Sequence, residues 1–75
     1  MPRFFCHLSH SGQNFEDERG FDAGDAPEAV RIARAIAEML LLHDPARGSD
    51  LLALYSESGT AIHSASIGDW TTGDR

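Results

Sequence analysis

Lysine is absent from this 75-residue chain, and six arginines face twelve carboxylates. The formal net charge of −6 repels a phosphate backbone, whereas nucleic-acid-binding proteins gain affinity by neutralising phosphates and releasing counterions. We therefore expect no nucleic-acid partner.

Cysteine and long apolar runs are also scarce. A single cysteine, Cys6, cannot form an intramolecular disulfide, and no cationic start is followed by an apolar signal region. Apolar stretches such as residues 39–42 are far shorter than the roughly 20 residues that cross a bilayer. We expect a cytoplasmic protein with no membrane contact.

The length limits the chain to one small core, because a domain of this size buries only roughly 60% of the surface that its unfolded chain exposes. We expect a single α+β domain over residues 1–69. The polar residues 70–75 resemble a frayed tail. Trp70 either anchors an interface or closes one end of the core.

Residues 3–8 have the alternation of a strand. Phe4, Cys6 and Leu8 lie on one face, and Phe5 and His7 on the other. A polar turn around Gly12 follows, and a second strand is expected within residues 14–19.

A helix is expected over residues 26–43. Asp25 is a good N-cap, Glu28 three positions later is its capping-box partner, and Pro27 suits the first turn. At the other end, His43 complements the helix dipole and Pro45 disfavours helical geometry at the residue before it.

The expected core face of this helix is broad, and it comprises Ala29, Ile32, Ala33, Ile36, Met39, Leu40 and His43. The polar arc of Arg31, Arg34 and Glu38 is narrow, and apolar residues including Leu41 and Leu42 border it. One sheet cannot cover both sides of the helix, so these leucines indicate a partner surface.

A late hairpin is expected from strands at residues 51–57 and 60–67. Gly59 would adopt a positive φ in a three-residue loop, which places Leu54 opposite Ile62. The order β-β-α-β-β predicts an antiparallel sheet of three or four strands with one helix across a face. Phe5 and Tyr55 then lie on the sheet face without a helix.

Cys6, His7 and His10 are the most suggestive candidates for metal ligation, because thiolate and imidazole bind zinc. On a strand, however, Cys6 and His7 point to opposite faces, and His63 would have to come from elsewhere. We therefore assign no metal site.

No motif predicts catalysis. The acidic residues 16–18 with Asp22 and Asp25 do not match the EF-hand spacing around either Gly20 or Gly24. No nucleophile elbow or phosphate-binding glycine pattern is present either. We expect no cofactor and no enzymatic activity.

Several landmarks resemble a known family. They are the opening Met-Pro-Arg-Phe-Phe-Cys-His, the Asp-Glu-Arg-Gly element at residues 17–20, and the Ala- and Arg-rich helix after Asp25. The chain is similar over about residues 1–67 to a family of small bacterial domains of unknown function that begin Met-Pro-Arg-(Tyr/Phe)-Phe-x-His. The resemblance implies a fold and carries no activity, cofactor or catalytic residue.

Two functions remain open. The first is a non-catalytic protein-interaction or regulatory module, with a homodimer as one form of it, that uses Leu41, Leu42, Phe5 and Tyr55. The second is a small metal- or ligand-binding protein that uses His7, His10, Cys6 or His63.

Overall fold

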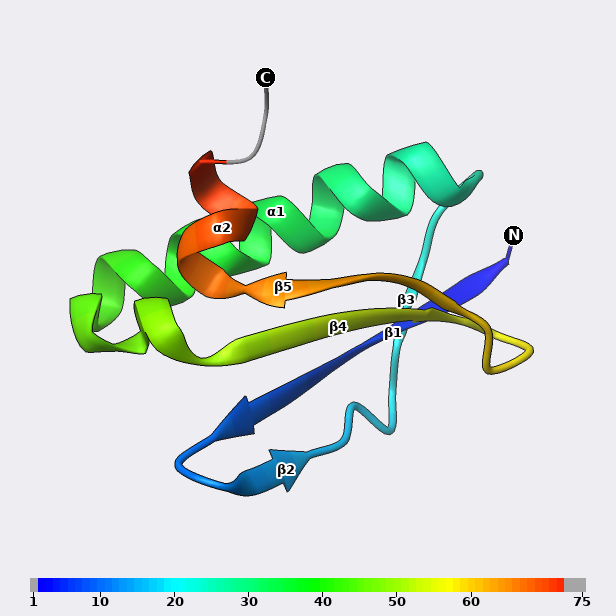
Figure 1. Ribbon diagram of the computed structural model, residues 1–75. Coiled ribbons are helices and arrows are strands. Elements are labelled where there is room, and N and C mark those ends of the chain that lie inside the picture. The colour runs from blue at the N-terminus through cyan, green and yellow to red at the C-terminus, as the bar shows by residue number, and fades with distance from the viewer. Residues whose placement is uncertain (1, 73–75) are drawn as a thin grey trace.

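The computed structural model describes residues 2–72. Along the chain lie β1 (Arg3–His10), β2 (Gln13–Phe15), β3 (Phe21–Asp22), α1 (Ala26–His43), the 3-10 helix η1 (Pro45–Ser49), β4 (Leu51–Ser56), β5 (Ala61–Ser66) and α2 (Ile67–Thr72). Figure 1 shows α1 and α2 on one side of the strands.

The strands form one antiparallel sheet in the order β2-β1-β4-β5, and β3 pairs with the beginning of β1. The expected α+β class with an antiparallel sheet is confirmed. The sheet has five strands, however, and α2 was not expected. The second strand was also misplaced, because β2 ends at Phe15 and the acidic residues 16–18 lie outside any strand.

The local signals placed both ends of α1 correctly. Asp25 Oδ1 accepts a hydrogen bond from the Glu28 amide at 2.9 Å, as expected for an N-cap. At the other end, the Asp44 amide donates to the Leu40 carbonyl at 3.0 Å. No described helix is long and apolar enough to span a membrane.

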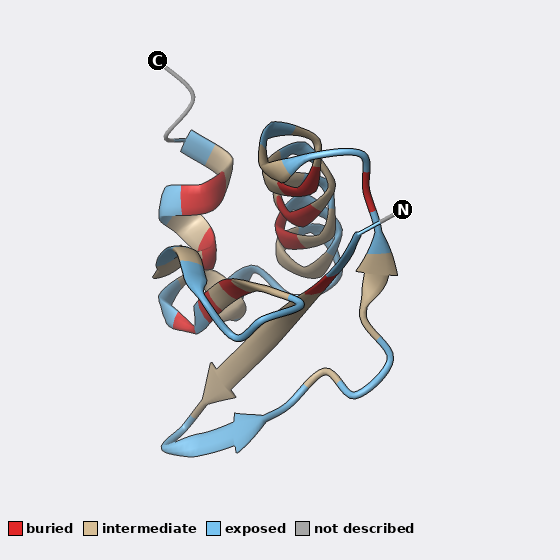
Figure 2. Ribbon diagram, turned by 90° about the vertical axis from the view of Figure 1, so that its right-hand side faces the viewer, coloured by how far each residue is buried: buried red, intermediate tan, exposed pale blue. Residues whose placement is uncertain are grey.

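The buried side of α1 differs from the expected one. Its fully buried residues are Ala29, Ala33 and Ala37, spaced one turn apart. Met39 and His43, both expected in the core, are exposed. The reason is α2, which packs beside α1 and moves the buried side of the helix toward Ala37. Figure 2 shows this buried line on the inner side of the helix.

The hairpin between β4 and β5 has the expected loop and a different register. Gly59 has φ 89°, and Ser56 donates its amide hydrogen to the Thr60 carbonyl at 2.8 Å. Leu54 nevertheless lies opposite His63, because a β-bulge shifts the pairing between Leu54 and Tyr55. The bulge adds one residue to β5, so Ile62 and His63 both contribute to the wall that faces α1.

The expectation of a frayed tail is wrong for residues 70–72, which belong to α2. Trp70 is 2% exposed, and its indole Nε1 donates to the Leu52 carbonyl at 2.8 Å. It therefore closes one end of the core, as one of its two sequence interpretations proposed. The rest of the expected tail, residues 73–75, lies outside the described residues.

Candidate functional site

The residues that suggested a metal site are dispersed. Cys6 is half-buried and packs against the core, whereas His7 lies on the opposite face of β1. His10 Nδ1 lies 2.8 Å from Asp50 Oδ2, and His63 packs edge-on against Trp70. Within residues 2–72, no group of three or more His, Cys, Asp or Glu side chains is placed to hold a metal ion.

The surroundings of Cys6 also disfavour the thiolate form of its side chain. Burial, with a contribution from the negative charge of Asp17, raises the pKa of the Cys6 thiol to about 12. Since the thiolate is the form that attacks electrophiles and binds metals, we expect Cys6 to react slowly near neutral pH.

The four expected interaction residues differ in their exposure and in their contacts within the chain. Phe5 and Tyr55 are cross-strand neighbours on the sheet face without a helix, and both are half-buried. The backbone of Gly20 lies against the Phe5 ring, since a Cβ at Gly20 would be 2.8 Å from Phe5 Cε2. The segment after β2 therefore covers part of this face within the same chain.

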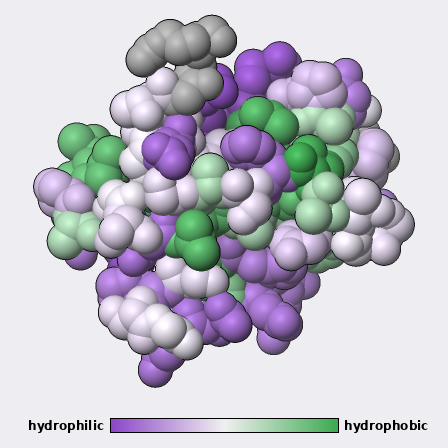
Figure 3. Space-filling model, viewed as in Figure 1, coloured by the Kyte–Doolittle hydropathy of each residue, from purple (hydrophilic) through white to green (hydrophobic). Residues whose placement is uncertain are grey.

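Leu41 and Leu42 also differ from each other in how far they are exposed. Leu41 is half-buried and packs against the core, but Leu42 is 82% exposed. Met39, three residues before Leu42 on the helix, is 61% exposed. The uncovered apolar surface of the helices is thus concentrated on the C-terminal half of α1, where apolar residues are visible at the left of Figure 3.

We define the outer face of α1 by its apolar residues Ile32, Ala35, Met39 and Leu42. Ile32 is half-buried and the other three are exposed. On the helix surface, Arg31 and Glu38 border this face on one side, and both are exposed. Their opposite charges provide a polar edge beside an apolar stripe.

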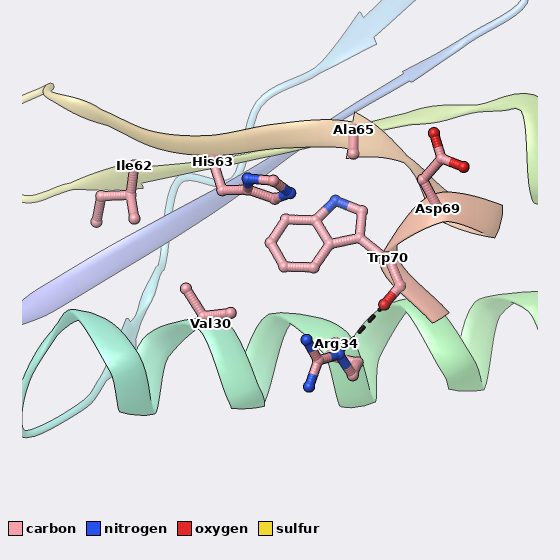
Figure 4. Close-up of a pocket in the computed structure, with 7 residues that line it drawn as sticks. All are labelled: Val30, Arg34, Ile62, His63, Ala65, Asp69 and Trp70. Carbon is pink, nitrogen blue, oxygen red and sulfur yellow. Dashed lines mark hydrogen bonds between the residues drawn. The ribbon is translucent and has the colours of Figure 1, made fainter. Parts of the chain in front are cut away.

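A cleft between α1, β5 and α2 is the second notable surface feature. It has a volume of about 470 Å³, and its lining residues are Val30, Arg34, Ile62, His63, Ala65, Asp69 and Trp70 (Figure 4). Arg34 Nε donates a hydrogen bond to the Trp70 carbonyl oxygen at 3.2 Å, so the helix α2 orients the guanidinium. The sequence did not indicate this cleft, since the wall depends on α2 and on the β-bulge.

A family model described as a domain of unknown function, DUF6894, matches residues 3–68. The chain belongs to the DUF6894 family. No curated protein and no solved structure matches the chain.

The part matched by the DUF6894 model ends at Gly68, so it contains β1 through β5 and only the start of α2. Asp69 and Trp70, which line the cleft, lie beyond the matched residues. The outer face of α1 lies wholly inside them. The family description names no activity, and the two surfaces must therefore be assessed by their own chemistry.

Asp17 and Gly20, in the element that carried the family resemblance, have a structural role in this DUF6894 domain. Asp17 accepts hydrogen bonds from the amides of Cys6, Arg19 and Gly20 at 2.9 to 3.2 Å. Its own amide donates to His7 Nδ1 at 3.0 Å. Burial acts to raise the pKa of Asp17, but these amide hydrogen bonds outweigh it and the net pKa is lowered. The hydrogen bonds of Asp17 thus hold residues 16–20 against β1.

Proposed function

We propose that this domain is a non-catalytic protein-interaction module that binds a second copy of itself through the outer face of α1. The observation that carries the proposal is the exposure of Met39 and Leu42, at 61% and 82%, on one side of a well-packed helix. Burial of apolar surface contributes about 25 cal/mol per Å², so covering two such side chains favours association. Contiguous exposed apolar residues often mark protein-interaction sites.

The spacing of the outer face suits a helical partner. Ile32, Ala35, Met39 and Leu42 follow one another at steps of three, four and three residues. This is the spacing by which paired helices interlock their side chains. Ala35, in the middle of the stripe, is small enough to let a second helix approach closely.

A second copy is favoured because the face is complementary to itself. In an antiparallel pairing about a two-fold axis near Ala35, Ile32 of one copy would meet Met39 of the other. Arg31 would likewise meet Glu38, since residues 31 and 38 lie on opposite sides of residue 35 at nearly equal separations. In these two pairs, apolar would face apolar and positive would face negative.

The other candidate surfaces are less available to a partner than the outer face of α1. Leu41 and Phe5 already have contacts within the chain, through the core and through Gly20 respectively. The net charge of −6 favours a protein partner over nucleic acid. A cytoplasmic location remains part of this proposal.

Sedimentation velocity tests the proposal directly. We expect the wild-type chain to be dimeric at about 50 μM, a concentration suited to micromolar self-association. Leu42→Asp should be monomeric at the same concentration, because it buries a charge in the dimer. Phe15→Asp is the matched control: Phe15 is 49% exposed on β2, and its substitution should leave the dimer intact.

Charge exchange tests the antiparallel arrangement. Arg31→Glu and Glu38→Arg should each weaken the dimer, and the double variant should restore it. A wild-type chain that stays monomeric well above this concentration would refute self-association. A double variant that is no tighter than either single variant would contradict the proposed pairing.

A further inference from the structure

The cleft between α1, β5 and α2 has the features of a small-ligand site. Its volume of about 470 Å³ falls in the range of roughly 300–1,000 Å³ that is typical of small-molecule sites. Three elements contribute to it, and most of its lining residues are apolar or aromatic. Figure 4 shows Val30 and Arg34 on the helix side, and Ile62 and His63 on the strand side.

Arg34 is the positive group of the cleft. Its Nε is engaged by the Trp70 carbonyl oxygen at 3.2 Å, and this hydrogen bond leaves the two terminal nitrogens of the guanidinium for a ligand. None of the ion pairs among residues 2–72 involves Arg34, although the sequence has twice as many carboxylates as arginines. An oriented guanidinium in a cleft matches the two oxygens of a carboxylate.

The aromatic part of the cleft is held by contacts with the rest of the domain. Trp70 is held by the hydrogen bond from its Nε1 to Leu52, and the His63 ring meets the indole edge-on with a centroid separation of 4.8 Å. Val30, Ile62 and Ala65 complete an apolar wall. Such a surface favours a ligand whose body is apolar or aromatic.

The charges disfavour a highly anionic ligand. Asp69 also lines the cleft, and the chain as a whole carries a net charge of −6. A phosphate ester with two negative charges would be repelled more strongly than a carboxylate with one. We propose that the cleft binds a small organic acid, with its single carboxylate on Arg34 and its apolar body against Val30, Ile62 and Ala65.

Trp70 is the sole tryptophan of the chain, so its fluorescence reports on the cleft directly. Phenylacetate and octanoate are suitable probes, with phenylacetamide as the uncharged analogue and phenyl phosphate as the dianion. We expect a saturable change in fluorescence with the two acids. The amide and the dianion should bind about tenfold or more weakly, because they lose the charged hydrogen bonds or meet the repulsion.

Two arginine variants separate ligand binding from structure. Arg34→Gln should weaken phenylacetate binding about ten- to hundredfold, whereas Arg19→Gln, in the exposed segment between β2 and β3, should leave it unchanged. Arg34→Lys keeps the charge without the planar fork and should fall between the wild type and Arg34→Gln. A thermal melt of each variant verifies that it is folded.

Three results would overturn the proposal. The first is no saturable response to either acid up to about 10 mM, above the millimolar range of weak binding. The second is equal binding of the acid and its amide. The third is the same loss of binding in the Arg19→Gln and Arg34→Gln variants. Arg34 lies outside the outer face of α1, so the two proposals can be tested separately. The ligand proposal can hold when the chain forms no dimer, and the dimer can form when the cleft binds no acid.

Discussion

The indole Nε1 of Trp70 donates a hydrogen bond to the carbonyl oxygen of Leu52, 2.8 Å away, and this bond joins α2 to the central sheet. Both residues are almost fully buried. The hydrogen bond satisfies a buried polar group at each end, while the indole itself is part of the hydrophobic core. The six-residue helix α2 has two buried side chains, Ile67 and Trp70, and both belong to the core.

Replacing Trp70 therefore tests whether the C-terminal helix belongs to the folding unit. Trp70→Ala should lower the free energy of unfolding by about 3–5 kcal/mol, the usual cost of removing a buried aromatic side chain. Trp70→Phe should cost less, although it leaves the Leu52 carbonyl without its partner. Urea titration followed by circular dichroism measures both. A loss below about 0.5 kcal/mol for Trp70→Ala, typical of surface substitutions, would mean that α2 is not part of the core.

Two glycines with similar backbones provide a matched pair. Gly20 and Gly59 have φ 71° and 89°. A Cβ at Gly59 would meet nothing within 4 Å, whereas one at Gly20 would lie 2.6 Å from the Phe4 carbonyl oxygen. We expect Gly59→Ala to cost about 1–2 kcal/mol from the backbone alone.

Gly20→Ala should cost clearly more than Gly59→Ala, since the backbone of β1 must also move. The same urea titrations measure both variants. Equal losses in the free energy of unfolding of the two variants would show that the close approach of residues 16–20 to β1 does not contribute to stability.

The lowered pKa of Asp17 predicts a pH-dependent contribution to stability. A carboxylate whose pKa is lower in the folded than in the unfolded chain stabilises the fold above the unfolded value, which is near 3.8. That stabilisation is lost as the pH falls below this value toward the folded pKa. The difference in stability between the wild type and Asp17→Asn should thus be larger at neutral pH than at about pH 3.

Glu18→Gln is the control for this comparison. Glu18 is exposed and makes no hydrogen bond among the described side chains, so its replacement should cost little. A stability difference for Asp17→Asn that stays the same across this pH range would contradict the role of the charged carboxylate.

Cys6 should be protected from alkylation in the folded protein. Its pKa of about 12, against an ordinary value of 9.0, lowers the thiolate fraction near neutral pH about a thousandfold. We expect iodoacetamide to label the native protein far more slowly than the urea-unfolded chain, as measured by mass spectrometry. Equal rates would place Cys6 in a solvated and unperturbed position.

The candidate surfaces could be predicted only in part. Leu42 was identified because it borders a narrow polar arc, and it is exposed in the structure. Met39 was missed, because the position of the buried side of α1 depends on where α2 packs. The cleft was missed entirely, since Arg34, His63 and Trp70 are distant in the sequence and meet only after the sheet, α1 and α2 have assembled.

The amino-acid sequence by itself determined the local features of this protein. The limits of α1 follow from Asp25, Glu28 and Pro45, and the turn at Gly59 follows from the residues of the loop, because hydrogen bonds and backbone sterics act over a few neighbours. Tertiary structure decided which side of α1 is buried, the bulge in β5 and the helical state of residues 67–72. Those features depend on packing between distant segments, since short polar stretches such as residues 69–72 become helical only where a buried side chain like Trp70 anchors them.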